Sequence, residues 1–204
     1  MNAFAQANMD YTSMGGYVQF FVSYSGVTLG TFGGPDGRIS EDAHDLVTIS
    51  GATGDGVLTI PLTLRGTGST NSQWYTPVAG FRVVAQGQLI DLTSPGSAVL
   101  DVPFTFGVPF VLDRFLDVGI DTSGISGPTG PVGGTADYLH TASLGPMLIR
   151  DHNGQVVLDA TATSSDGFSY PLSSDAPEPG TVALMSAGIV ALLLRRRING
   201  FGNV

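Results

Sequence analysis

The sequence predicts an all-β fold, an antiparallel β-sandwich of jelly-roll type, followed by a short C-terminal transmembrane helix. Three observations carry this prediction. Charged residues make up only 12% of the chain while hydrophobic residues reach 42%, glycine is frequent with 29 residues, and the apolar runs are short. Low charge combined with frequent glycine and short apolar runs is typical of strands that are separated by turns.

Two segments alternate apolar and polar residues with a period of two. Leu58–Leu64 places large apolar residues on one side and threonine or proline on the other, and Leu100–Phe106 repeats this pattern. Such alternation predicts half-buried antiparallel strands. Because proline cannot donate a ladder hydrogen bond, Pro61 and Pro103 predict that both strands lie at a sheet edge or carry a bulge.

Eight further segments have the composition of short strands. They are Tyr17–Tyr24, Val27–Phe32, Leu46–Ser50, Gly80–Gln86, Pro109–Val118, Tyr138–Leu144, Met147–Arg150 and Gln155–Thr163. About ten strands without a helix between them favour a sandwich. We expect Asp151–Gly154 to form a tight turn, since Asn-Gly readily supplies positive φ angles, and Thr122–Thr135 to form a long glycine-rich loop.

The N-terminus contains a short run of small residues. Ala5-Gln6-Ala7 resembles the end of a secretory signal peptide, although the charged and apolar parts that normally precede it are missing. We therefore interpret residues 1–7 as a remnant of a signal peptide. The β-sandwich domain is expected to occupy residues 8–172.

The composition excludes several kinds of chemistry. The chain has no cysteine and no lysine, which removes disulfides, thiolate metal sites and lysine-based catalysis. Residues 8–176 hold sixteen Asp and Glu but only five Arg, a net charge of −11. A domain this acidic repels nucleic acid, so we expect no nucleic-acid partner. We also expect no cofactor and no metal site.

The composition changes after the expected sandwich. Residues 173–180 form a polar linker containing Pro177, Glu178 and Pro179, and residues 181–194 carry no charge. Arg195, Arg196 and Arg197 follow, and residues 198–204 form a short tail. Fourteen helical residues cover about 21 Å, less than the roughly 30 Å hydrocarbon core. We therefore predict a transient transmembrane helix at 181–197, with the arginines in the cytoplasm and the body outside.

This arrangement of Pro177-Glu178-Pro179, an apolar helix and the arginine cluster resembles the PEP-CTERM sorting signal of Gram-negative bacteria. The resemblance implies recognition by exosortase, a membrane-embedded cysteine protease thought to cleave near the motif. It implies transient anchoring in the inner membrane, then delivery to the cell surface or the extracellular space, often alongside exopolysaccharide, which we therefore count among the expected partners. The seven residues after Arg197 depart from the family, which usually ends at the arginines.

Acidic residues and histidines are the other candidates for site chemistry. We expect Asp36–Asp45 to form an oxygen-rich loop that is solvated, since its spacing does not match a Ca²⁺-binding loop. Asp113, Asp117 and Asp121 would share one sheet face if their segment is extended. The three histidines, His44, His140 and His152, are scattered and predict no zinc site.

Three interpretations of function remain open. The first is a non-enzymatic surface or extracellular-matrix protein, since the chain has neither a His-Glu-x-x-His nor a Gly-x-Ser-x-Gly signature. The alternative is a surface carbohydrate-binding module in which Trp74 and Tyr75 stack on a sugar ring, although aromatic residues more often fill a core. A secreted hydrolase is the third and weakest interpretation.

Overall fold

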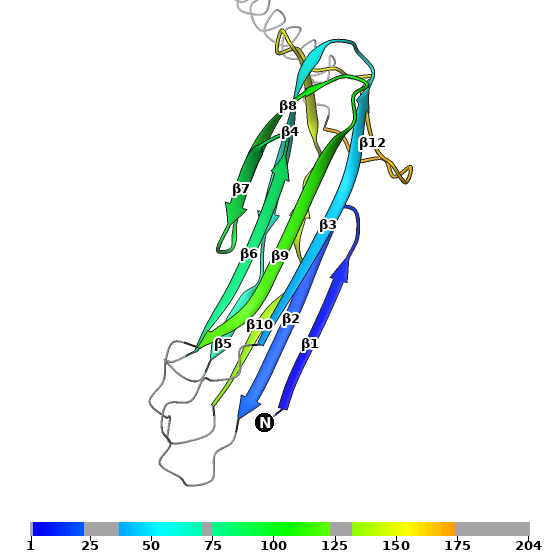
Figure 1. Ribbon diagram of the computed structural model, residues 1–204. Helices are drawn as coiled ribbons and strands as arrows, with labels where there is room; N and C mark the ends of the chain where they lie inside the picture. The colour runs from blue at the N-terminus through cyan, green and yellow to red at the C-terminus, as the bar shows by residue number, and fades with distance from the viewer. Residues whose placement is uncertain (1, 23–36, 71–74, 123–131, 174–204) are drawn as a thin grey trace, which may run out of the picture. The chain divides into compact units, whose positions relative to one another are not determined.

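The computed structural model describes residues 2–22, 37–70, 75–122 and 132–173 (Figure 1). These residues belong to one compact unit, Met1–Ser173. They contain twelve strands: β1 Asn2–Met9, β2 Ser13–Val22, β3 Gly37–Ser50, β4 Asp55–Leu64, β5 Thr67–Thr70, β6 Tyr75–Ala85, β7 Gln88–Leu92, β8 Gly96–Thr105, β9 Phe110–Thr122, β10 Val132–Leu144, β11 Leu148–Asp151 and β12 Thr161–Ser164.

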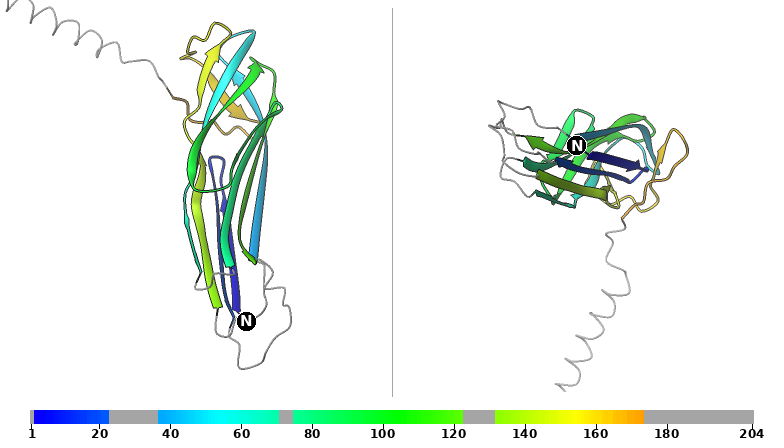
Figure 2. Two further views of the ribbon diagram at one scale, coloured as in Figure 1. Left: turned by 90° about the vertical axis from the view of Figure 1, so that its left-hand side faces the viewer. Right: turned by 90° about the horizontal axis from the view of Figure 1, so that it is seen from below.

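The strands form two sheets that lie face to face (Figure 2). The seven-stranded sheet has the order β1-β2-β10-β4-β11, with β5 paired to β10 and β8 paired to β4. The five-stranded sheet has the order β12-β3-β9-β6-β7. Every strand pair is antiparallel, which confirms the predicted all-β antiparallel sandwich.

The pairing order is that of a jelly roll. Without β1, β5, β11 and β12, eight strands remain, and they pair from the outside of the sequence inward. The first of them pairs with the last (β2 with β10), and the second with the seventh (β3 with β9). The third pairs with the sixth (β4 with β8), and the fourth with the fifth (β6 with β7). This nested pairing wraps one long hairpin around a common core.

The core lies between the two sheets. The apolar residues of β4 that alternate with threonine and proline, Leu58 to Leu64, are fully buried, as the period-two pattern predicts. Leu112, Leu116, Val118 and Ile120 of β9 are buried from the opposite sheet. A Cβ atom on Gly16 of β2 would lie 3.1 Å from Val118 Cγ2, so the two sheets approach closely there. Each fully buried aliphatic side chain contributes about 1.5–3 kcal/mol.

The N-terminal residues are part of the sheet. β1 covers the residues that we interpreted as a signal-peptide remnant, and Ala5 pairs with Val18 of β2. Residues 2–7, which the predicted sandwich at 8–172 left out, are therefore paired into the sheet. The alternation that marks other strands is weak here because β1 is an edge strand and its residues are mostly exposed.

The two strand prolines differ in position. Pro103 lies in β8, which pairs only with β4 among the described strands, so the predicted edge position is confirmed. For Pro61 the edge alternative is wrong, because β4 is a central strand. Its carbonyl accepts a hydrogen bond from Gly145 N at 2.7 Å, where the partner of β4 changes from β11 to β10. The missing N–H faces this break in the ladder, which explains why a proline is tolerated.

Several segment boundaries also differ from expectation. The part of Asp36–Asp45 that the structure describes is not a loop but belongs to β3, and Gln155–Thr163 is irregular until β12 begins at Thr161. The turn at Asp151–Gly154 is confirmed, with Gly154 at a φ of 79°. Val27–Phe32 lies outside the described residues. No helix among the described residues is long and apolar enough to cross a bilayer.

Candidate functional site

The outer face of the five-stranded sheet carries a groove of about 610 Å³. Its floor is a row of short side chains, because the strand register aligns Ser40 of β3, Asp117 of β9 and Gly80 of β6. A Cβ atom on Gly80 would meet only Asp91 Oδ1 and Leu92 O, both at 4.0 Å. The absence of a side chain at Gly80 therefore leaves open space in the middle of the sheet.

The next row of residues forms a wall of the groove. Asp42 of β3, Phe115 of β9, Arg82 of β6 and Asp91 of β7 are in register across four neighbouring strands. All four line the groove, and the phenyl ring of Phe115 is half-buried. An aromatic ring therefore lies in register between a carboxylate and a guanidinium group.

Two ion pairs fix the charged side chains of the groove. Arg82 Nη2 and Nε donate to Asp91 Oδ2 at 2.9 and 3.3 Å. Arg38 Nε donates to Asp117 Oδ1 at 3.1 Å, and Ser40 Oγ donates to the same oxygen at 3.2 Å. Both arginine side chains are 52% exposed, so each pair contributes at most about 1 kcal/mol to stability. The pairs therefore hold side chains in place more than they hold the fold together.

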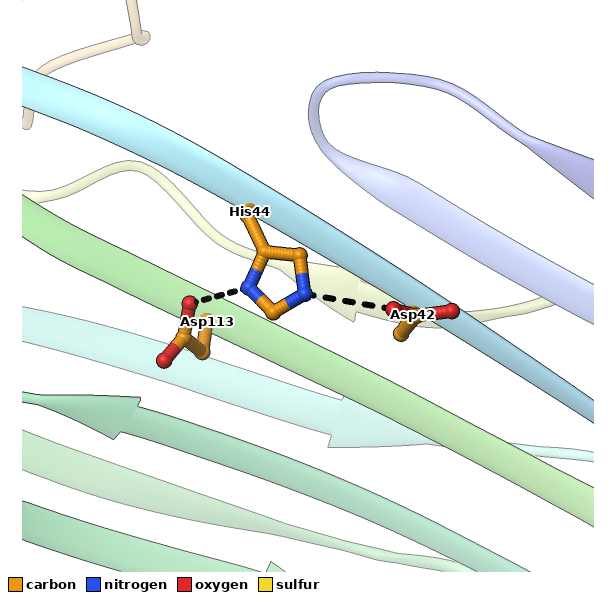
Figure 3. A network of polar contacts seen from close by, with 3 residues as sticks. All are labelled: Asp42, His44 and Asp113. Atoms are coloured by element: carbon orange, nitrogen blue, oxygen red, sulfur yellow. Dashed lines mark hydrogen bonds and ion pairs between the residues drawn. The ribbon is translucent and has the colours of Figure 1, made fainter.

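His44 lies beside the groove, between two carboxylates (Figure 3). Its Nδ1 is 2.6 Å from Asp113 Oδ1, directly opposite on β9, and its Nε2 is 3.2 Å from Asp42 Oδ2, two residues back on β3. The hydrogen bond to Asp113, followed by the charge of that residue, raises the pKa of His44 above its usual value. Protonated His44 would donate to both carboxylates and link β3 to β9.

The contacts of His44 do not form a catalytic triad. In a triad one ring nitrogen faces a carboxylate and the other faces the nucleophile, whereas here both nitrogens face carboxylates. Nor do the described residues contain a group of three or more His, Asp or Glu side chains that could hold a metal ion. His44 is therefore best described as a cross-strand clamp.

A second polar network lies on the inner side of the same sheet. Arg114 is buried, and its Nη1 donates to the carbonyl oxygens of Asp10 and Tyr11 in the β1–β2 turn. Asp45 is also buried and accepts a hydrogen bond from Tyr170 Oη. Burial, followed by the hydrogen bond to Asp45, raises the pKa of Tyr170, which therefore stays protonated and remains a donor.

The same network anchors the end of the folded domain. Tyr11 stacks on Phe168, with ring centroids 4.3 Å apart and an interplanar angle of 6°. Beyond this point Tyr170 N donates to Ala162 O at 2.9 Å, and Ser173 N donates to Met147 O at 2.7 Å. The chain is therefore hydrogen-bonded to the sandwich as far as Ser173, the last residue that the structure describes.

Comparison with known protein families gives one match, which begins two residues beyond Ser173. Residues 175–197 match the model of the PEP-CTERM protein-sorting motif. The chain carries a PEP-CTERM sorting motif. No curated protein and no solved structure matches the chain.

The PEP-CTERM match confirms the resemblance that the sequence predicted. It covers every residue assigned to the sorting signal: Pro177, Glu178, Pro179, Arg195, Arg196 and Arg197. These residues lie outside the described part of the structure. The transmembrane helix predicted at 181–197 lies there too and stays a prediction.

The predicted sugar-stacking pair is not tested by the structure. Trp74 lies outside the described residues, and Tyr75 begins β6 but its side chain is not described. Of the histidines, His44 is in β3 and His152 is exposed in the turn after β11, while the side chain of His140 is not described. Asp113 and Asp117 do share one face of β9, as predicted for an extended segment, while the side chain of Asp121 is not described.

The groove residues were missed by sequence reasoning. They include Arg38, Arg82, Asp91 and Phe115, which stand on four different strands and meet only through the strand order β3-β9-β6-β7. One local signal was present. Gly80 interrupts an otherwise strand-like run, and a glycine in a strand interior often marks a bulge or a place where a ligand approaches closely.

Proposed function

We propose that this chain is an exported bacterial protein whose C-terminal motif directs exosortase-dependent sorting to the cell surface. The observation that carries the proposal is the match of residues 175–197 to the PEP-CTERM protein-sorting motif. Exosortase is the proposed processing partner. The β-sandwich is then the part that remains at the surface or in the extracellular matrix.

In this proposal the C-terminal tail anchors the chain in the membrane only temporarily. Residues 181–194 are uncharged but would span only about 21 Å as a helix, which suits a brief insertion better than permanent anchoring. Arg195, Arg196 and Arg197 remain in the cytoplasm by the positive-inside rule, which leaves the folded domain outside.

The end of the domain restricts where processing takes place. Ser173 is hydrogen-bonded to Met147, and Pro177 follows four residues later. A fully extended chain of this length reaches at most about 14 Å. A protease that cleaves near the motif therefore works close to the folded domain, unless Tyr170 to Ser173 detach first.

We propose no catalytic activity for the sandwich. The histidine nearest to a cluster of acidic residues has both ring nitrogens occupied by carboxylates, which leaves neither one to activate a nucleophile. Delivery of a binding or structural domain is the function that fits this arrangement, with exopolysaccharide as the expected surrounding material.

The experiment that tests sorting compares three chains in a Gram-negative host that has an exosortase. They are the wild type, a chain that ends at Ala176, and a chain with Arg195, Arg196 and Arg197 all replaced by serine. A matched control replaces the same arginines by lysine and keeps the charge. Cell fractionation should place the wild type and the lysine control at the surface, and the other two chains elsewhere. Identical distribution of all four chains would refute the proposal.

A further inference from the structure

The groove on the five-stranded sheet offers hydrogen-bonding atoms that the protein itself does not use. Asp91 accepts both bonds from Arg82 through Oδ2, and Asp117 accepts from Arg38 and Ser40 through Oδ1. Within the described part of the chain, Asp91 Oδ1, Asp117 Oδ2 and Arg82 Nη1 have no hydrogen-bond partner. Acceptors and a donor therefore line one groove, each held in place by an ion pair.

The groove also contains an apolar surface, the aromatic ring of Phe115. Phe115 is half-buried, is in register with Arg82, and its ring packs edge-on against His44, with centroids 6.0 Å apart and an interplanar angle of 83°. Such an edge-to-face contact is an arrangement that aromatic pairs prefer. The groove volume of about 610 Å³ lies within the roughly 300–1,000 Å³ range of small-molecule sites.

The charges of the groove select against ions. Arg38 and Arg82 are each paired with a carboxylate, and a further carboxylate, that of Asp42, also lines the groove. A phosphate or another anion would meet more negative than positive charge. A cation would compete with guanidinium groups and with His44, which already occupy the carboxylates. A neutral ligand that both donates and accepts hydrogen bonds meets neither obstacle.

We propose that this groove binds a neutral oligosaccharide, with one sugar ring stacked on Phe115 and its hydroxyl groups bonded to Asp91, Asp117 and Arg82. A sugar hydroxyl donates and accepts at once, so adjacent hydroxyls match a carboxylate oxygen beside a guanidinium N–H. The C–H face of the ring covers the phenyl ring. The site differs from the predicted Trp74–Tyr75 pair, and it is independent of sorting, since either proposal can fail without the other.

The test exploits two strand glycines whose backbone does not require glycine. Gly80→Val fills the floor of the groove, where a Cβ atom meets nothing closer than 4.0 Å. Gly96→Val is the matched control, because Gly96 is exposed in β8 of the other sheet and its Cβ would meet nothing closer than 3.8 Å. Both variants place a strand-favouring residue in a strand, so both should fold.

Binding is measured on the full chain by isothermal titration calorimetry, in a detergent that carries no sugar headgroup. The panel contains neutral gluco-, galacto-, manno- and xylo-oligosaccharides, an oligogalacturonate as the anionic probe and a chitosan oligomer as the cationic probe. We expect at least one neutral oligosaccharide to bind. Gly80→Val should weaken this binding by about tenfold or more, and Gly96→Val should leave it unchanged.

A second variant tests the stacking contact separately. Phe115→Leu keeps an apolar side chain but removes the ring, and we expect affinity to fall about threefold to tenfold. Absence of binding to every neutral oligosaccharide at millimolar concentration would overturn the proposal. So would binding only of the anionic or the cationic probe, or neutral binding that Gly80→Val does not weaken.

Discussion

Replacement of Tyr170 by phenylalanine tests how the end of the domain is held. Tyr170 is only 3% exposed and Asp45 is 7% exposed, and the tyrosine hydroxyl donates a hydrogen bond to the Asp45 carboxylate. Tyr170→Phe keeps the ring, so packing is preserved and no cavity forms. What is lost is the donor to a buried acceptor, which costs about 1–3 kcal/mol.

The expected change is large enough to measure. For a domain of this size, each kcal/mol shifts Tm by about 2–4 °C, so Tyr170→Phe should lower Tm by about 2–12 °C. Thermal unfolding of the full chain, followed by far-UV circular dichroism, gives this value. Urea unfolding gives the free energy independently, and an unchanged m-value would show that the change is one of stability.

A double-variant cycle identifies the cause. In the Asp45→Val background the tyrosine hydroxyl has lost its acceptor, so Tyr170→Phe should there be neutral or stabilising, because removing both partners is cheap. The effect of one substitution therefore reverses or vanishes when the other is present. Equal losses in both backgrounds would refute the reasoning, since they would mean that the hydroxyl and the carboxylate do not depend on one another.

Three further changes probe other parts of the structure. The pKa of His44 is raised, so the charge of His44 stabilises the fold fully below the unfolded pKa of about 6.5, and this stabilisation is lost as the pH rises through the raised pKa. The difference in Tm between the wild type and His44→Gln should therefore shrink from pH 5.5 to pH 9. A difference that stays constant over this range would contradict the role of His44 as a cross-strand clamp. Gly66 has a φ of 135°, and a Cβ atom there would lie 2.4 Å from Tyr138 Cδ1. Gly66→Ala should therefore lower the free energy of unfolding by about 1–3 kcal/mol from backbone strain alone. An unchanged midpoint of urea unfolding would contradict this expectation. Arg114→Met removes two charge-assisted hydrogen bonds to the β1–β2 turn and should speed amide hydrogen exchange in β1 more than in β6; equal exchange in both strands would show that Arg114 does not anchor the turn.

The sequence predicts the sandwich well where one sheet face is buried. β4 and β8 alternate cleanly, because each has one face in the core and one in solvent. β1 and the first part of β3 were not predicted as strands, each for its own reason. β1 is an edge strand without a regular buried face, and β3 places the acidic residues Glu41 and Asp45 on its inner side, where the period-two pattern predicts apolar ones.

The sorting motif and the groove differ in how far each can be predicted from the sequence. The PEP-CTERM motif is continuous, so Pro177 to Arg197 could be read directly from the chain. The groove is assembled by strand order, and no local pattern places Phe115 beside Arg82 or puts Gly80 opposite Asp117. Its residues follow only from the nested pairing of β3 with β9 and of β6 with β7, which periodicity does not specify.

Intact-mass analysis of the protein collected from the surface of cells that have an exosortase tests the central claim most directly. The account predicts a chain that retains the sandwich through Ser173 and has lost the residues beyond the Pro177-Glu178-Pro179 motif, including Arg195 to Arg197. The same analysis in cells without the exosortase should give the uncut C-terminus. Surface protein that still ends at Val204 in exosortase-containing cells would contradict the account.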